Sequence, residues 1–453
     1  MFVSKKRLLS LLVTVVFVAA GCLGGCASPA AVVGSPAVSN EPAGSAQPAG
    51  TGQTAAANAD PAWDDKPIEL KFWYTYGADS AERKQLLDVV LPSWSKMHPN
   101  VKIKAVPQES GESYHQATVA AIATGATPDI ARIDIIYTAA YAKRGALAAL
   151  DAFPDFEAIK GTFLEAPLAT NFYKGKYYGL PLDTNCKAAV INTNVMKAMG
   201  IADGIPETME EFITAAEPYV KPTGKSVLHV SGVGDWDLYP YFWLFGGVLT
   251  NEDFTKASGF LDSAQSVGAM GKMLDLYQKK VFSIGEIDGT VDAWGKMESG
   301  LYGMYFEGPW YFGAYDENKS PVVVPALIPT YNGKTASVVG GQDIVVFAKS
   351  KYPEASYEFA KFMCTEDLQN AMLEAGVFPT LKAVSESEKI KSDPVLSIYM
   401  EQIKSAGVRI PSPEHAAIFE IWKNAVNKIF LKGADIQTEL TNAAKLIDAK
   451  LAS

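Results

Sequence analysis

Apolar and polar residues follow two distinct periods along the chain. Residues 68–75, IELKFWYT, predict a β-strand that ends in a buried aromatic run, and residues 101–106, VKIKAV, alternate cleanly as a second strand. Between them, apolar residues recur at the spacing of one helical face: Leu87, Val90, Leu91 and Trp94. The order strand, helix, strand predicts an α/β fold.

The ends of this first helix are also indicated by particular residues. Asp79 and Glu82 have the spacing of a capping box at a helix start. Pro92 lacks a backbone N–H group, so we expect it to kink or end the helix.

The alternation of strands and helices continues to the C-terminus. Strands are predicted within residues 124–134, 188–192, 226–232, 300–310 and 342–350, and helices around residues 114–123, 137–144, 207–220 and 352–363. Two further helices follow. The first carries the apolar stripe Ile418, Trp422, Val426 and Ile429, and the second begins near Ala434.

The N-terminal residues have a different pattern. A basic segment, Met1–Arg7, precedes an apolar run, Leu8–Ala20, and small residues then lead to Cys22 and Cys26. This order is typical of a secretory signal peptide. Both cysteines end a sequence similar to the bacterial lipobox, AAGC or LGGC, and Leu23 favours Cys26 as the lipidated residue. The alternative is an ordinary secreted protein with two incidental cysteines.

Residues 27–63 are rich in Ala, Gly, Ser, Pro and Thr and contain almost no large apolar side chains. Such a segment cannot bury a core and is expected to be a flexible tether. We therefore expect residues 1–26 to be a lipoprotein signal region, and a cysteine with two or three acyl chains to anchor the protein stably. The folded part would then lie outside the cytoplasm, on the outer face of the cell membrane.

Composition places the chain among globular proteins. Its 453 residues are 48% hydrophobic and 20% charged, and the length suggests two or three domains. Removal of residues 1–26 takes away Lys5, Lys6 and Arg7 and no acidic residue, so the formal net charge changes from −10 to −13. So acidic a protein is not expected to bind nucleic acid. Cys186 and Cys364 remain in the body, and we expect two free thiols.

Several motifs together resemble one protein family. The segments TGATPDIARID, GKYYGLPLDTNCKAAVINTNVMKAMGI, PETMEEF, FEGPW, GGQDIVVFAKSKYPEASYEFAKFM and AGVFPT occur in the order found in extracellular solute-binding proteins of ABC importers. The maltose-binding protein and other sugar receptors are the most similar type. The resemblance extends from about Ile68 to the end of the chain. It implies a sugar or oligosaccharide ligand, the transmembrane subunits of an ABC permease as partners, a monomer, and no cofactor or metal.

The resemblance also implies the domain organisation. The expected fold is α/β and two-lobed, like periplasmic binding proteins, with a mixed sheet and flanking helices in each lobe and a hinge of several crossings. Lobe 1 would comprise residues 64–183 and 341–379, and lobe 2 residues 184–340 and 380–453. The crossings are expected near Leu182–Asn185, Lys334–Gly341 and Val377–Leu381. Ligand would be held between the lobes.

A sugar offers apolar C–H faces and hydroxyl groups, so its site needs aromatic platforms and planar polar side chains. Trp310 follows Gly308-Pro309 and matches an aromatic stacking residue of the maltose-binding protein. Trp236 matches another, and Gly232 and Gly234 suggest that it lies in a loop. The alternative for either residue is a core tryptophan.

Polar candidates lie at the crossings. Asp183 and Asn185 would bond sugar hydroxyls, with Asn185 at the place of a family carboxylate; the alternative is a hydrogen bond to hinge backbone. Gln342 and Asp343 either reach the ligand or satisfy the glycine-rich turn before them.

The remaining candidates lie in the first lobe. By the resemblance, Asp134 and Tyr137 sit where the family's first lobe meets ligand. Ile133 and Ile136 replace a tryptophan and an aspartate of the maltose receptor, so the resemblance does not specify maltose as the sugar. Tyr76 is a further candidate, with a core aromatic as the alternative.

Two other functions are considered. A glycoside hydrolase needs two carboxylates across one bond, for which Asp183 and Glu307 are the available pair. No motif of a hydrolase, a zinc protease or a P-loop supports an enzyme. Within the family, a polyamine, an amino acid or an organophosphate is the alternative ligand. Because the candidate loops contain aromatic and amide side chains and few Arg or Lys beyond Arg132 and Lys187, a neutral sugar is favoured.

Overall fold

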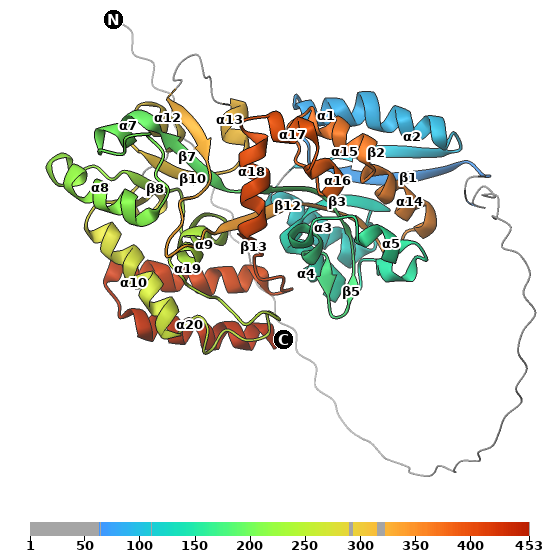
Figure 1. The fold of residues 1–453 in the computed structure, drawn as a ribbon. Helices are drawn as coiled ribbons and strands as arrows, with labels where there is room; N and C mark the ends of the chain where they lie inside the picture. Colours follow the sequence, from blue (N-terminus) through green and yellow to red (C-terminus); the bar gives the residue numbers. More distant parts are fainter. Residues whose placement is uncertain (1–62, 64, 110, 290–292, 315–321, 453) are drawn as a thin grey trace, which may run out of the picture. The chain divides into compact units, whose positions relative to one another are not determined.

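Two mixed β-sheets, each flanked by helices, form the part of the chain that the computed structural model describes, which is residues 63, 65–109, 111–289, 293–314 and 322–452 (Figure 1). This confirms the predicted α/β class with mixed sheets. Residues 1–62, which include Cys22, Cys26 and most of the expected tether, lie outside the described residues.

The first sheet is centred on β12 and has the order β13-β12-β3-β1-β2, with β6 also paired to β12. β1 runs parallel to β2 and β3, whereas β12 runs antiparallel to β3 and β6. The predicted strands at residues 68–75 and 101–106 are confirmed as β1 and β2. The strands are β1 (Ile68–Tyr74), β2 (Val101–Pro107), β3 (Ile130–Asp134), β6 (Leu180–Cys186), β12 (Ser337–Val346) and β13 (Ala406–Gly407).

The first helix differs from its prediction at both marked positions. Its cap is Ser80, whose hydroxyl accepts from the Arg83 backbone N–H at 3.2 Å, so the Asp79 capping box is wrong. Pro92 does not end the helix. A π-helical turn, η1 (Leu86–Val90), separates α1 (Ala81–Gln85) from α2 (Leu91–Met97), and Pro92 lies in the first turn of α2. The π turn accommodates the missing N–H, since the chain stays helical through it and the Leu91 N–H still bonds to the Leu86 carbonyl.

Aromatic packing joins the helices to the first sheet. Trp94 is fully buried, donates from Nε1 to the Val101 carbonyl at 2.9 Å, and meets Phe359 edge to face at 5.1 Å. The other elements beside this sheet are α3 (Glu112–Thr124), η2 (Ile135–Tyr137), α4 (Thr138–Lys143), η3 (Leu150–Ala152), α5 (Phe156–Lys160), α6 (Glu165–Ala169), β4 (Phe172–Tyr173), β5 (Lys176–Tyr177), α14 (Pro353–Met363), α15 (Glu366–Leu373) and α16 (Lys382–Ser385).

The second sheet has the order β11-β7-β10-β8-β9. β8 is parallel to β9 and β10, and β7 is antiparallel to β10 and β11. The strands are β7 (Ala188–Asn192), β8 (Leu228–Val230), β9 (Phe282–Ile284), β10 (Met304–Glu307) and β11 (Val323–Ala326). β7, β8 and β10 confirm the strands predicted within residues 188–192, 226–232 and 300–310.

The predicted C-terminal stripe is buried against the second sheet and its helices. Ile418, Trp422, Val426 and Ile429 all belong to one large core, and Trp422 donates from Nε1 to the Val233 carbonyl at 2.9 Å. The helices on this side are α7 (Thr193–Ala198), α8 (Met209–Thr223), α9 (Asp235–Leu244), α10 (Ala264–Gln278), α11 (Gly285–Asp288), α12 (Ala293–Glu298), α13 (Trp310–Ala314), α17 (Glu388–Ser392), α18 (Leu396–Gln402), η4 (Ile403–Ser405), α19 (His415–Lys432) and α20 (Ile436–Leu451).

The three segments predicted as crossings lie against one another. The Thr184 backbone N–H donates to the Phe378 carbonyl at 3.2 Å, and the Thr184 hydroxyl donates to the Gly340 carbonyl at 3.1 Å. Gly341 has φ +135°, and a Cβ there would lie 2.2 Å from the Asp183 carbonyl oxygen, so the close contact requires glycine. The lobe boundaries themselves remain a prediction.

Cys186 and Cys364 are buried free cysteines, as predicted. Among the described residues, no helix is both long and apolar enough to cross a membrane.

Candidate functional site

A cleft of about 710 Å³ opens beside β6 and is lined by residues of the first sheet, by residues that follow β10 of the second sheet, and by connecting segments. Four predicted site residues line it, namely Tyr76, Asp183, Asn185 and Trp310. The other lining residues are Glu82, Arg132, Thr184, Pro309, Phe312, Leu373, Glu374, Ala375, Gly376, Val377, Phe378, Asp393, Val395 and Leu396. The cleft therefore combines aromatic rings with carboxylate and amide groups.

Trp310 is the aromatic side chain that the cleft leaves most exposed. It begins α13, directly after β10, and 41% of its surface is accessible. A Cβ on Gly308 would lie 2.3 Å from the Trp310 indole, so the glycine lets the ring fold back over the turn.

Trp236 lies next to Trp310 but on a different element from the one predicted. It is in the first turn of α9, where a loop was expected, and its backbone N–H donates to the Asp235 carboxylate at 2.6 Å. A carboxylate at a helix start satisfies an N–H group that has no partner within the helix, so the Gly-rich run leads into a helix. The ring packs on Gly340, where a Cβ would lie 2.6 Å from it.

Arg132, which sequence analysis did not select, organises the first-sheet side of the cleft. Its Nη2 and Nε atoms donate to Asp183 Oδ2 at 2.9 and 3.1 Å, and its Nη1 donates to the Thr75 hydroxyl at 2.6 Å. Its guanidinium carbon lies 4.4 Å from the centre of the Tyr76 ring. Burial alone would lower the pKa of Arg132, but the negative charge of Asp183 raises the pKa above its usual value, so the guanidinium stays charged.

The contacts with Arg132 fix the positions of the Asp183 and Tyr76 side chains. One Asp183 oxygen accepts both bonds from Arg132, and the Tyr76 ring faces the same guanidinium. The position of Arg132 on a strand, between the buried residues Ala131 and Ile133, was the sequence signal for a buried arginine. Its partner could not be predicted, because Asp183 is distant in the sequence.

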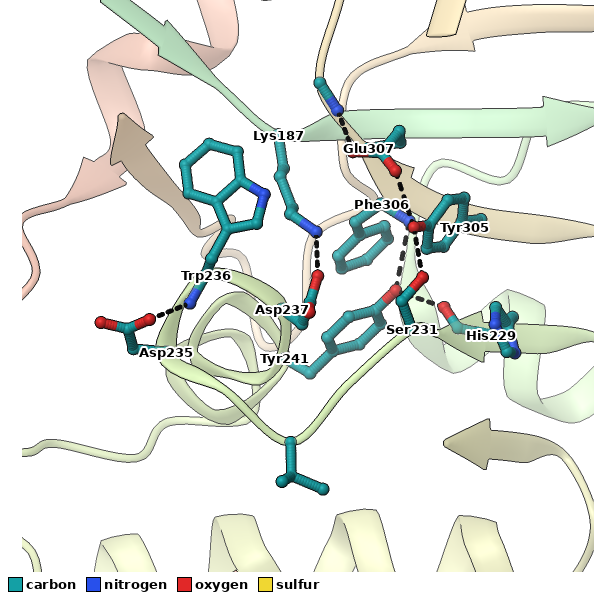
Figure 2. A network of polar contacts seen from close by, with 12 residues as sticks. Lys187, His229, Ser231, Asp235, Trp236, Asp237, Tyr241, Tyr305, Phe306 and Glu307 are labelled. Carbon is teal, nitrogen blue, oxygen red and sulfur yellow. Dashed lines mark hydrogen bonds and ion pairs between the residues drawn. The ribbon is translucent and has the colours of Figure 1, made fainter. Parts of the chain in front are cut away.

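Lys187 and Asp237 form a second ion pair, beside Trp236 (Figure 2). Lys187 Nζ donates to Asp237 Oδ1 at 2.6 Å and lies 5.3 Å from the Trp236 ring centre. The lysine side chain is 1% exposed, so solvent screens this ion pair little. A lysine within the apolar run before β7 was the sequence signal for a buried cation.

Glu307, at the end of β10, is occupied by hydrogen bonds within the protein (Figure 2). Tyr305 donates from its hydroxyl to Glu307 Oε2 at 2.7 Å, Trp294 donates from Nε1 to the same oxygen at 3.2 Å, and the Gly308 N–H donates to Oε1 at 2.7 Å. The carboxylate therefore fixes the turn that precedes Trp310.

Asp134 and Tyr137 lie beside the cleft at the end of β3. Asp134 Oδ1 accepts from the Ile136 N–H at 3.1 Å and pairs with Arg409 Nη2 at 3.5 Å. The half-buried Tyr137 ring stacks on His115, with ring centres 4.0 Å apart.

Gln342 and Asp343 have different surroundings. Gln342 is half-buried. In the strand register of the first sheet it lies opposite Asp134 on β3 and opposite Asp183 on β6. Asp343 is fully buried, accepting from Thr138 at 2.6 Å and from Asn171 at 2.8 Å. Burial raises the pKa of Asp343 to about 8. The structure thus places Asp343 inside the first sheet's packing, with no surface toward the cleft.

Comparisons with known proteins give a consistent picture. The model of the bacterial extracellular solute-binding protein family matches residues 93–397. The arabinooligosaccharide-binding protein of Bacillus subtilis is 23% identical over 409 residues, covering 84% of this chain and 87% of the relative. The maltotriose-binding protein of Pyrococcus abyssi is 24% identical over 373 residues, covering 79% of this chain and 77% of the relative.

A solved structure shares the fold. The cyclic alpha-maltosyl-1,6-maltose binding protein from Arthrobacter globiformis superimposes with a TM-score of 0.73 at 22% identity, covering 85% of this chain and 99% of that chain. The described sheets and their connections thus match the two-lobed arrangement expected from the sequence.

Proposed function

Because the chain belongs to the bacterial extracellular solute-binding protein family, we propose that it captures a neutral sugar or oligosaccharide in its cleft for an ABC importer. The observation that carries the proposal is the exposed indole of Trp310 on a cleft that also presents Asn185. Ring faces bind the C–H faces of a sugar, and planar polar groups bind its hydroxyls. The relatives named above, which bind arabinooligosaccharides and maltotriose, support this ligand class.

The charges around the site support a neutral ligand. Each cation close to Tyr76 or Trp236 has a carboxylate partner: Arg132 pairs with Asp183, Lys187 with Asp237, and Arg409 with Asp134. A phosphorylated ligand would need an uncompensated cation, and a polyamine would need uncompensated carboxylates at the aromatic platforms. The paired charges leave the surroundings of Tyr76 and Trp236 neutral. Elsewhere the cleft is lined by the carboxylates of Glu82, Glu374 and Asp393, which disfavour a phosphorylated ligand; Glu374 pairs with Lys389.

The proposal includes no catalysis. The carboxylates that a hydrolase would use are Asp183 and Glu307, and both are held by hydrogen bonds from neighbouring side chains. A general acid or nucleophile must be available to the substrate. The two residues are better explained as supports of Arg132 and of the turn before Trp310.

We also propose that the protein is a monomer tethered through Cys26, or Cys22, to the outer face of the membrane, with the transmembrane subunits of a permease as its partner. Tethering would keep the receptor at high effective concentration near that permease. The lobes would be residues 64–183 with 341–379 and residues 184–340 with 380–453, closing on the sugar about the three crossings.

A thermal-shift screen followed by calorimetry tests the ligand class. The panel should contain maltotriose, an arabinotriose, spermidine and glucose 6-phosphate. A ligand at one hundred times its Kd adds about 2.7 kcal/mol of stability, which is a clear shift in Tm. We expect a shift with a neutral sugar. A shift with spermidine or glucose 6-phosphate alone would contradict the proposal.

A further inference from the structure

The segment between β13 and α19 leads from the first sheet, to which β13 belongs, into the core around the second sheet. Ile410 is buried in the core around the second sheet, together with Trp422. Its neighbour Arg409 reaches Asp134 at the end of β3, with 3.5 Å between Nη2 and Oδ1. Ile133, next to Asp134, belongs to a core on the first sheet. Arg409 thus lies where the chain leaves β13 of the first sheet and enters the core of the second, and it contacts the end of β3 from there.

Arg409 also contacts one of the two indoles beside the cleft. Its guanidinium carbon lies 5.5 Å from the centre of the Trp236 ring. A planar guanidinium can pair with a carboxylate through its edge and lie on an aromatic ring with its face, which an ammonium group cannot do. Arg409 is suited to both contacts at once.

The burial of Arg409 shows that this position is not a general surface ion pair. Its side chain is only 9% exposed, whereas that of Asp134 is 38% exposed. Its Nε–H group is buried and has no hydrogen-bond partner among the described residues. A buried donor without a partner costs stability, so packing of either core does not explain the residue.

A second ion pair joins the same two regions and provides a matched comparison. Lys143 on α4 pairs with Glu414, directly before α19, at 3.2 Å. The two side chains are 34% and 30% exposed. Solvent screens such a pair, which typically contributes little.

We propose that Arg409 is a positioning residue of the cleft: by holding Asp134 and the Trp236 ring at once, it favours the closed arrangement of the two sheets. This inference rests on the proposed function, because it assigns the residue to the sugar-binding cleft. A larger population of the closed form in the empty protein raises the apparent affinity for any ligand that binds that form.

Distance measurements on the empty protein test the inference without a ligand. Spin labels are placed on Leu87→Cys and Leu446→Cys, both exposed and on opposite sheets' helices, in a full-length chain with Cys22 and Cys26 replaced by Ala. Cys186 and Cys364 are buried and remain. Double electron–electron resonance then measures the distance between the two labels in Arg409→Gln and in Lys143→Gln.

We expect Arg409→Gln to shift the distance distribution toward the longer, open distances by a population ratio of roughly five- to tenfold. Lys143→Gln should change that ratio by less than about twofold. An unchanged distribution in Arg409→Gln, or an equal shift in Lys143→Gln, would overturn the inference. If Arg409→Gln does not fold, Arg409→Lys, which keeps the charge and loses the planar group, takes its place with a smaller expected shift.

Titration with maltotriose separates positioning from a general structural role. Arg409→Gln should weaken binding roughly tenfold at unchanged Tm, and adding Asp134→Asn should cost little more, since the two residues act as a pair. If the affinity losses of Arg409→Gln and Asp134→Asn add up in the double variant, the two residues do not act as a pair. Absence of maltotriose binding in the unmodified protein would count against the choice of sugar, while the distances still decide the role of Arg409.

Discussion

The indole rings of Trp236 and Trp310 lie 5.8 Å apart, centre to centre, with 31° between their planes. Each belongs to the first turn of a short helix that follows a strand, β8 for Trp236 and β10 for Trp310. Because β8 and β10 are parallel neighbours, their carboxyl ends deliver the two rings to the same edge of the second sheet. Trp310 lines the cleft, and Trp236 packs directly against it.

Replacement of Trp310 by Ala should weaken sugar binding far more than folding. Loss of one indole platform should cost about 2 kcal/mol of binding, or roughly thirtyfold in Kd. The exposed ring supports little of the core, so Tm should change little. Calorimetric titration and thermal melting measure both quantities.

Trp422→Ala is the control for Trp310→Ala, because Trp422 is fully buried in the core of the second sheet. It should cost about 3–5 kcal/mol of stability. A Trp310→Ala protein with normal affinity and a comparably reduced Tm would assign Trp310 to the core and remove the main support for a carbohydrate ligand.

Gly340→Ala should disturb the site through two neighbours. The added Cβ would lie 2.3 Å from Asn185 Oδ1 and 2.6 Å from the Trp236 ring, so both side chains must move. We expect roughly a tenfold loss of affinity, measured by titration with the sugar found in the screen. Gly268→Ala is the matched control, since nothing lies within 4 Å of its Cβ and it sits within α10. That change should be neutral or slightly stabilising, and equal affinity of both variants would contradict the contact.

The stability of the protein should depend on the titration of Asp343. Its pKa is raised to about 8 from 3.8 by burial, so the folded state holds a proton that the unfolded state has lost between those values. Stability contributed by this group is therefore greatest below pH 4 and falls as the pH rises toward 8. Asp343→Asn, which mimics the neutral acid, should remove this fall.

The pH dependence of Asp343→Asn and of the unmodified protein should be compared above pH 6.5, where the titration of His229 contributes least. Burial lowers the pKa of His229 to about 4 from 6.5, which makes stability rise with pH between those values and opposes the effect of Asp343. Urea unfolding at pH 6.5 and pH 8 measures the difference. A parallel loss of stability in Asp343→Asn and the unmodified protein would refute the assignment.

The N-terminal anchor can be tested by detergent partition. The native protein, expressed in a bacterial host, should enter the detergent phase through its acylated cysteine. A Cys22→Ala, Cys26→Ala protein should remain in the aqueous phase. Single replacements identify the lipidated residue, for which Leu23 favours Cys26. Continued partition of the double variant into detergent would rule out the lipid anchor.

The periodicity of the sequence was sufficient for most elements. Alternating and helical patterns identified β1, β2, β7 and the buried stripe of α19, because those patterns record which face of each element meets the core. The errors were local. The Asp79 cap and a helix end at Pro92 were wrong, because Ser80 provides an equivalent oxygen and a π turn accommodates the proline.

The chain by itself determined the α/β class, the order of elements, the positions of the aromatic candidates and the acidic composition. Only the tertiary structure decided how charges are paired around them. Arg132 with Asp183, Lys187 with Asp237 and Arg409 with Asp134 are each brought together by sheet order and by the crossings between sheets. Local patterns cannot predict such pairs, because hydrophobic periodicity specifies the face that a residue occupies and carries no information about which distant side chain lies opposite.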